Sequence, residues 1–364
     1  MLSTSYACFS PAGQMSCSTF LLRQPQGALI GHNLDAPYHV PGVIVCNPRD
    51  IQKTSMSFFE LVSAQKPPAP PLWWTSTFGS VTFNPMGCEF PDGGINEVGL
   101  YVQEMTLPGT RFPSDPQRPR MFMAQWIQYL LDTCQSVADV LAIMDRVVLD
   151  GWEWHFFIAD QAGHAAAIDF FEGQAHSYTD AAMPIPILCN ACYRDEIAKL
   201  TVYAGFGGQR PIQAHDIRFD RFVHAADLLQ RVSLPSAITD AFAILAQLER
   251  GATQWSHVID LQTRSVHFRT AQAHHIKYLE IDKLTFSRAT PVKVVDINQA
   301  TPGDVTTLFR AYSAQENWRQ VKQIIETVDE REGGFTSVVT AQNQTLAGLI
   351  HRMANYPCAI GILS

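Results

Sequence analysis

The sequence predicts an α+β fold in which two antiparallel sheets pack face to face and helices cover their outer faces, a four-layer α-β-β-α sandwich. Strand-like and helix-like segments come in blocks, without the strict alternation that parallel sheets require. The strand-like segments are short, rich in β-branched and aromatic residues, and bounded by Gly, Pro, Asn or Asp. The chain has 364 residues, 46% of them hydrophobic, which is enough for a large core.

The first strands form a predicted hairpin. Residues 18–22 and 27–34 flank "RQPQG", whose Pro and Gly favour a turn. Further strands are expected at 42–47, 78–84, 93–105, 154–160, 165–173, 175–179, 256–261, 265–270 and 275–281. Together these strands would form two antiparallel sheets.

Two helix pairs interrupt the strands. Residues 120–134 carry apolar side chains at helical spacing after Pro119, and Ser136 can cap a second helix that follows it. A second pair is expected at about 218–231 and 236–250, and a further helix near the C-terminus at about 303–330. These helices would supply the two outer layers.

Composition argues against several kinds of partner. The formal net charge of −8 makes nucleic acid an unexpected partner, and the chain has neither a polybasic run nor an apolar stretch long enough for a membrane span. Eight scattered cysteines are typical of reduced thiols, which favours the cytoplasm, with the periplasm or secretion as alternatives. The pair Cys189 and Cys192 is a weak metal signal without a second pair, so no metal or organic cofactor is expected.

Three segments are expected along the chain. Residues 1–16 have no Lys or Arg and no apolar core, so we interpret them as a removable pro-segment or a start assigned too early. Residues 17–330 are predicted to form a single domain, and residues 331–364 a C-terminal extension to which the sequence assigns no role.

The chemistry is expected around Cys17. A thiol nucleophile needs a base, and a cysteine at the N-terminus of a processed chain carries one in its own α-amine. Cys17 directly precedes a predicted strand, and only a short peptide precedes it. Asp35 ends the returning strand of the hairpin, where its carboxylate can hold that amine, and His32 lies on the same strand.

At these residues the chain resembles a known family. "CSTFLL…GALIGHNLDAPY" is similar to the opening of the choloylglycine hydrolase family, which contains the bile salt hydrolases and penicillin V acylases and belongs to the N-terminal-nucleophile hydrolases. Four further stretches follow in the family's order: 90–100, 186–193, 217–229 and 253–270. The resemblance spans roughly residues 17–300.

The resemblance implies roles for individual residues. Cys17 would be the nucleophile, with its freed α-amine as base, and Asp35 would orient that amine. The side-chain amide of Asn190 and the backbone N–H of Asn96 would stabilise the oxyanion, and Arg221 would hold the nucleophile end of the site. Each of these residues also has an ordinary structural reading, as a core thiol, a turn residue or a surface ion pair.

The chain departs from the family's pattern at several positions. His32 stands where the family usually has Arg, and we expect it either to support the site from behind or to pack at the strand end. Cys189 precedes the motif Asn190, and Asp220 precedes Arg221, at positions where the family has Thr and Ser.

The implied function is hydrolysis of linear, non-peptide C–N amide bonds through an acyl-thioester, after autoproteolytic processing. The implied partner is a small-molecule N-acyl amide, for example a bile acid conjugate, penicillin V or an N-acyl homoserine lactone, and the implied assembly is a homotetramer or homodimer. An acyltransferase of related fold and a catalytically silent homologue are the alternatives. Four aromatic residues are interpreted either as an acyl pocket or as core: Trp73, Trp74, Phe78 and Phe83.

Overall fold

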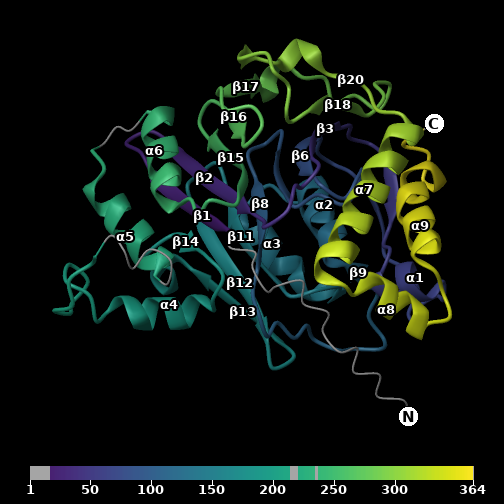
Figure 1. Cartoon of the computed structure of the whole chain (residues 1–364), viewed down its shortest axis with the longest axis horizontal. Coiled ribbons are helices and arrows are strands. Elements are labelled where there is room, and N and C mark those ends of the chain that lie inside the picture. The colour runs from purple at the N-terminus through teal and green to yellow at the C-terminus, as the bar shows by residue number, and fades with distance from the viewer. Residues whose placement is uncertain (1–16, 214–219, 234–236, 364) are drawn as a thin grey trace.

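The computed structural model of the chain describes residues 17–213, 220–233 and 237–363 (Figure 1). Two large, mainly antiparallel sheets pack on each other, and helices lie against both outer faces. The predicted fold class is therefore confirmed. The predicted pro-segment, residues 1–16, lies outside the described residues.

One sheet has seven strands, and the N-terminal hairpin supplies the second and third of them from one edge. Its order is β14 (Ile187–Leu188), β1 (Ser18–Arg23), β2 (Ala28–Asp35), β15 (Thr253–Asp260), β16 (Ser265–Thr270), β17 (Lys277–Glu280) and β19 (Gly303–Asp304). All neighbours are antiparallel except β17 and β19. The late strands thus pair directly with the first ones.

The other large sheet has nine antiparallel strands. Its order is β13 (Gln174–Thr179), β12 (Ala165–Phe171), β11 (Trp154–Ala159), β8 (Tyr101–Thr106), β7 (Gly93–Asn96), β6 (Ser80–Asn84), β3 (Val43–Asn47), β18 (Lys293–Asp296) and β20 (Arg310–Ala311). Two small two-stranded sheets pair β4 (Gln52–Thr54) with β5 (Trp73–Thr75), and β9 (Arg120–Phe122) with β10 (Val148–Asp150).

Helices cover the two sheets on opposite sides. Against the seven-stranded sheet lie α5 (Arg221–Arg231) and α6 (Ile238–Leu248), with α4 (Tyr193–Leu200) beside α5. The nine-stranded sheet is covered by α2 (Met123–Thr133), which is followed by α3 (Val137–Ile143). The remaining helices are α1 (Phe58–Ser63), α7 (Ala314–Glu332), α8 (Phe335–Ala341) and α9 (Leu346–Ala359).

Local sequence explains where these elements begin. The Ser136 hydroxyl accepts a hydrogen bond from the N–H of Asp139, as the cap prediction requires. The predicted helix at 120–134 begins only at Met123, because Arg120–Phe122 pairs as β9 with β10. In the predicted strand at 93–105, positive φ at Gly99 permits a tight turn that separates β7 from β8.

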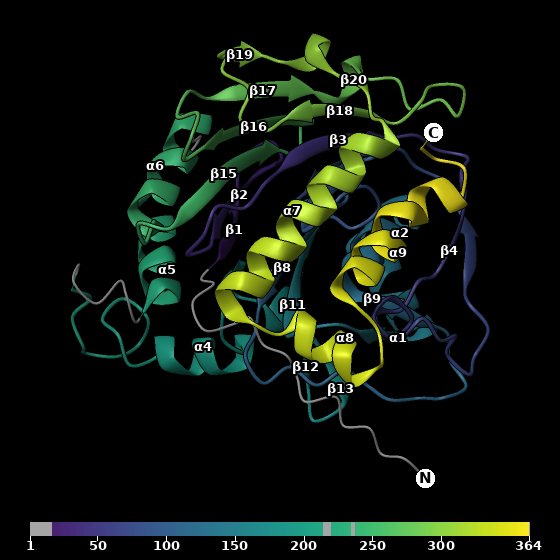
Figure 2. The ribbon, with the colours of Figure 1, turned by 45° about the vertical axis from the view of Figure 1, so that its right-hand side comes forward.

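The C-terminal residues pack on the rest of the chain. The helix expected at 303–330 begins only at Ala314 as α7, because residues 303–311 form the short strands β19 and β20 and a 3₁₀ turn between them. The helix α9 runs beside α7 (Figure 2). The side-chain amide of Asn317 in α7 donates to the carbonyl of Ala354 in α9, at 2.9 Å. Tyr356 in α9 is buried and its hydroxyl donates to the carbonyl of Thr54 at the end of β4. Residues after 331 are thus joined to the body that the first 330 form.

The hairpin that carries Cys17 is fixed by a close approach. Residue 19 of β1 faces His32 of β2, and residue 20 faces Gly31. The Phe20 ring covers Gly31 so closely that a Cβ there would lie 2.3 Å from its Cζ. This position therefore needs glycine, and the resulting register brings the end of β2 back toward Cys17.

The core between the two sheets centres on aromatic rings. Phe83 of β6 stacks on His257 of β15, with ring centroids 4.4 Å apart, and meets Phe268 of β16 edge-on. The Tyr101 hydroxyl of β8 lies 2.9 Å from the Nε2 atom of His257. Phe83, Phe268 and His257 have no exposed surface. Since these contacts cross from one sheet to the other, they set the spacing between the sheets.

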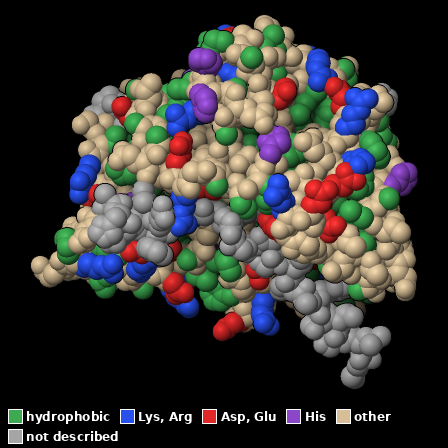
Figure 3. All heavy atoms as spheres, in the orientation of Figure 1, with side chains coloured by type: hydrophobic (Ala, Val, Ile, Leu, Met, Phe, Trp, Pro, Cys, Tyr) green, Lys and Arg blue, Asp and Glu red, His purple; other side chains and the backbone are tan. Residues whose placement is uncertain are grey.

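The outer surface is mixed in character. On the face shown in Figure 3, basic side chains of described residues are interspersed with acidic ones. No helix within the described ranges is both long and apolar enough to span a bilayer.

Replacing Phe83 with Ala should lower the free energy of unfolding by about 3–5 kcal/mol, because it removes a fully buried ring and leaves a cavity between the sheets. Urea denaturation followed by circular dichroism measures this. Trp73→Ala is the control, since 60% of Trp73 is exposed, and should change the value by less than about 1 kcal/mol. Equal losses in the two variants would contradict the assigned core.

Candidate active site

Cys17 lies at the head of β1 with no exposed surface. Its neighbour on the same strand face, Thr19, donates its hydroxyl to the sulfur of Met105 in the other sheet, so this face points between the sheets. Burial raises the pKa of the Cys17 thiol well above its ordinary value, and the charges of Glu104 and Asp35 raise it further. A hydrogen bond from the Asp35 backbone and the charge of Arg221 oppose this. The thiol therefore stays protonated at neutral pH and needs a base.

Asp35 is held from two other elements. The hydroxyl of Thr253 on β15 donates to Oδ1 at 2.5 Å, and Nη1 of Arg221 on α5 lies 3.5 Å from Oδ2. The carboxylate has no exposed surface. The hairpin thus delivers Asp35 to Cys17, as predicted from its place at the end of the returning strand.

Arg221 joins the site's parts through a single guanidinium group. Nη1 donates to the hydroxyl of Ser18 at 3.1 Å and also contacts Asp35, while Nη2 donates to Oδ1 of Asn190 at 2.6 Å. Arg221 is the first residue of α5 and is 6% exposed. Because a guanidinium donates in a fixed fork, it sets the spacing between β1, β2 and the turn that carries Asn190.

Asn190 presents a side-chain amide of defined orientation. Its Oδ1 accepts from Arg221, and its Nδ2 donates to the carbonyl of Thr106 at the end of β8, at 2.7 Å. Since the oxygen faces the cation, the amide nitrogen must face the other way. One N–H of that nitrogen remains after the bond to Thr106.

Sequence reasoning missed the residues that hold the Asn190 turn. Nε2 of His155 lies 2.7 Å from the carbonyl oxygen of Cys189, and Nδ1 lies 2.8 Å from Oδ1 of Asp169. The other Asp169 oxygen accepts from the N–H of Tyr193 at 2.8 Å. His155 and Asp169 are fully buried on neighbouring strands of the nine-stranded sheet. The signal was a single polar residue inside each of two otherwise apolar strands.

The structure does not bring Asn96 to this group. Its backbone N–H donates to the carbonyl of Leu100 at 2.9 Å, and its side-chain amide donates to the carbonyls of Leu131 and Cys134. Its side-chain oxygen accepts from the N–H of Leu100. With its N–H already engaged in the turn between β7 and β8, Asn96 has a structural role instead of the predicted oxyanion contact.

His32 lies in the core between the sheets. Nδ1 lies 2.8 Å from the hydroxyl of Thr19, and its ring centroid is 4.9 Å from that of His257. Burial lowers the pKa of His32 well below its ordinary value and that of His257 to about 3, so both are neutral. His32 thus supplies no positive charge at the position where the family usually has Arg.

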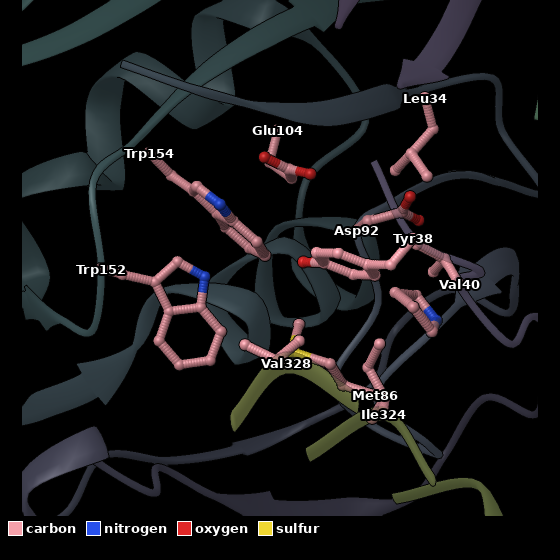
Figure 4. Close-up of a pocket in the computed structure, with 11 residues that line it drawn as sticks. Leu34, Tyr38, Val40, Met86, Asp92, Glu104, Trp152, Trp154, Ile324 and Val328 are labelled. Carbon is pink, nitrogen blue, oxygen red and sulfur yellow. The ribbon is translucent and has the colours of Figure 1, made fainter. Parts of the chain in front are cut away.

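The aromatic residues suggested from sequence as an acyl pocket lie elsewhere. Trp73 is largely exposed, Trp74 donates its indole N–H to Asp132, and Phe83 packs between the sheets. A different cavity, of about 60 Å³, is lined in part by Leu34, the residue before Asp35 (Figure 4). Its lining residues are Leu34, Tyr38, Val40, Pro85, Met86, Asp92, Glu104, Trp152, Trp154, Ile324 and Val328.

Two further features concern cysteines and metals. Cys189 and Cys192, like the other cysteines within the described ranges, are free thiols. Nowhere in the part of the chain that the structure describes do three or more His, Cys, Asp or Glu side chains gather as a metal site would require.

Comparison with known proteins places the chain. The family model for linear amide C–N hydrolases, choloylglycine hydrolase family, matches residues 17–241, more than half of the sequence. The chain belongs to this family. It is accordingly a linear amide C–N hydrolase, and the match begins at Cys17. A search of curated proteins finds no match.

Solved structures of the family share the fold. Penicillin V acylase from Agrobacterium tumefaciens is 19% identical with a TM-score of 0.71, and the alignment covers 82% of this chain and 98% of that one. A variant of conjugated bile acid hydrolase from Clostridium perfringens is 14% identical with a TM-score of 0.65, over 79% and 98% of the two chains. At such identities the likeness is one of fold.

Stability should fall between pH 7 and pH 5 through the buried histidines. The pKa of His257 is about 3 when folded, so below its ordinary value near 6.5 only the unfolded chain binds the proton. Between pH 7 and pH 5, the free energy of unfolding of His257→Gln should therefore fall by about 2 kcal/mol less than that of the parent protein. Urea unfolding of both proteins at the two pH values measures the difference, and an unchanged pH dependence in the variant would contradict the neutral, buried state of His257.

Proposed function

We propose that Cys17 is the nucleophile and that the acyl group of a linear amide passes through a thioester on its sulfur. The observation that carries the proposal is the shared guanidinium of Arg221, which gathers Ser18, Asp35 and Asn190 around the head of β1. The family match that begins at Cys17 supports it. The proposed function thus needs Cys17 at the head of β1, with the Asp35 carboxylate and the Asn190 amide held beside it by Arg221.

The base is the α-amine of Cys17. Burial keeps the thiol pKa high, so a proton acceptor must lie within reach of the sulfur. As long as residue 16 is joined to Cys17, that nitrogen is an amide and has no basic lone pair. Removal of residues 1–16 turns it into an amine, and Asp35 at the end of β2 orients it. The pro-segment is therefore part of the mechanism.

The reaction then runs in two steps. The α-amine takes the thiol proton, the sulfur attacks the amide carbon, and the remaining N–H of Asn190 stabilises the oxygen that becomes negative. The C–N bond breaks as the α-ammonium returns its proton to the departing amine. Water then attacks the thioester with the same α-amine as base, and the acid leaves with Cys17 restored.

The substrate is a small-molecule N-acyl amide. The names of the two structural neighbours give penicillin V and conjugated bile acids as their substrates. These compounds are therefore the first to test here. N-acyl homoserine lactones are a third class with the same bond. The proposed cytoplasmic location rests on the scattered cysteines, and the proposed homodimer or homotetramer rests on the family resemblance.

Hydrolysis should depend on Cys17 alone among the thiols. Protein that begins at Cys17 is incubated with penicillin V, a glycine-conjugated bile acid and an N-acyl homoserine lactone, and the released amine is measured. Cys17→Ala should lower the rate at least about 10³-fold, whereas Cys358→Ser on α9 should keep the parent rate. Equal activity of Cys17→Ala would refute the proposal, and transfer of the acyl group only to added amines would favour an acyltransferase.

Asp169→Asn should lower kcat about 10- to 100-fold and change KM less, because Asp169 orients His155 and, through it, the Asn190 turn. Steady-state kinetics on a substrate of the parent enzyme gives both values, at a temperature where thermal unfolding shows the variant to be folded. Asp115→Asn, at a half-buried loop position where the carboxylate pairs with Arg118, is the control. If Asp169→Asn lowered the melting temperature but left kcat at the parent value, the pairing of Asp169 with His155 would have only a structural role.

A further inference from the structure

Two buried carboxyl groups face the cavity that Leu34 helps to line. Asp92 and Glu104 each have 1% of their surface exposed, and Figure 4 shows both among the side chains around the cavity. They come from adjacent chain segments, since the N–H of Glu104 on β8 donates to the carbonyl of Asp92 just before β7. Two acids thus share one small apolar space.

These carboxyl groups are poorly satisfied by the protein. Oε2 of Glu104 accepts no hydrogen bond from the described residues, and the Asp92 carboxyl meets only the backbone N–H groups of Asp92 itself and Gly93, which lower its pKa without forming well-aligned bonds. Other buried carboxylates are partnered: Asp132 pairs with Lys53, and Asp150 accepts two backbone N–H groups. A buried polar group without a partner costs free energy, so its retention needs an explanation.

The walls of the cavity suit an organic cation. Trp152, Trp154 and Tyr38 present aromatic rings beside the two acids, and the other walls are aliphatic. No Lys or Arg stands among the described residues that line the cavity. Carboxylates and aromatic faces both attract a positive charge, whereas an anion would meet two acids here. An ammonium group on a short apolar body matches this lining.

The cavity is coupled to the nucleophile. Leu34, which lines the cavity, directly precedes Asp35, and an ionised Glu104 raises the pKa of the Cys17 thiol. Burial raises the pKa of Asp92 and of Glu104, which favours their neutral forms while the cavity holds no cation. A bound ammonium would let them ionise and would balance the negative charge that opposes a thiolate at Cys17.

The enclosed position favours the acyl part of the substrate. In the proposed reaction the amine leaves first, while the acyl group stays on the sulfur until water releases it. Asp92 and Glu104 have almost no contact with solvent, so a group bound to them is poorly placed to leave early. The group that occupies the cavity should therefore be the one that remains attached to Cys17.

We propose that this cavity binds a protonated amino group on the acyl part of the substrate, so that the enzyme prefers aminoacyl amides to their neutral counterparts. Asp92 and Glu104 receive the ammonium, and Trp152, Trp154 and Tyr38 enclose the short chain that carries it. The inference rests on the proposed function of Cys17, but the binding it describes can be measured without turnover.

The test compares substrates that differ only in the charged group. 3-Aminopropanoyl and butanoyl p-nitroanilides form one pair, and 6-aminohexanoyl and heptanoyl p-nitroanilides another, each replacing an ammonium by a methyl group. We expect kcat/KM to be at least about tenfold higher for the ammonium member of a pair. Asp92→Asn and Glu104→Gln should each remove most of that preference, measured as the ratio of kcat/KM between the two members of a pair.

Two controls keep the result interpretable. Asp282→Asn removes an exposed carboxylate that pairs with Arg264 and does not line the cavity, and it should keep the preference. Thermal unfolding should show melting temperatures for Asp92→Asn and Glu104→Gln that are not lower than the parent's, since each change removes a buried carboxyl group whose hydrogen bonding is incomplete. Calorimetric binding of propylammonium, with propanol as the neutral comparison, reports the cavity directly.

The outcomes separate the two claims. Hydrolysis of the neutral anilides that depends on Cys17, with no preference for the ammonium member, would overturn the cavity inference and leave the proposed function intact. Binding of propylammonium that Asp92→Asn abolishes, with no amide cleaved, would support the cavity inference and count against the proposed function. No binding of propylammonium to the folded parent protein, together with no preference, would overturn the inference.

Discussion

The guanidinium of Arg221 is the interaction on which the site depends. It donates to Ser18, contacts Asp35 and donates to Asn190, residues that lie on β1, β2 and the turn after β14. These segments lie up to 172 positions apart along the chain, counted as 190 minus 18, and only the packing of α5 against β1 and β14 brings the cation to all of them. Since burial leaves this charge little water, its partners must supply its hydrogen bonds, which fixes their positions.

Desolvation explains both the chemistry and its control. The same burial that fixes Arg221 raises the pKa of the Cys17 thiol, so the sulfur is inert until a base is supplied. In the proposed mechanism that base is created by removing residues 1–16. The neutral His32 and His257 behind Cys17 fit this environment, because a cation there would have to be desolvated between the sheets. Desolvation also bears on Asp92 and Glu104 at the cavity, because a bound cation can supply the interactions that the protein does not give these buried acids.

Local patterns predicted much of the fold and part of the site. The hairpin, the Ser136 cap and the helices α5 and α6 follow from turn residues, capping and periodicity, and the place of Asp35 follows from the hairpin. Asn96 was misread because a turn asparagine and an oxyanion donor look alike in sequence. The pairing of His155 with Asp169, and of Asp92 with Glu104, depends on which strands become neighbours and on what covers them. No short-range pattern contains that information.

The central claim is that Cys17 becomes the first residue of the working enzyme. The most direct test is N-terminal sequencing combined with the intact mass of protein purified after expression of residues 1–364, paired with assay of the same sample. The account predicts a chain that begins at Cys17 in active protein, and a Cys17→Ala variant that retains residues 1–16 if the removal is autocatalytic. Full amide hydrolase activity from a chain that still begins at Met1 would contradict it, because Cys17 would then have no α-amine to act as base.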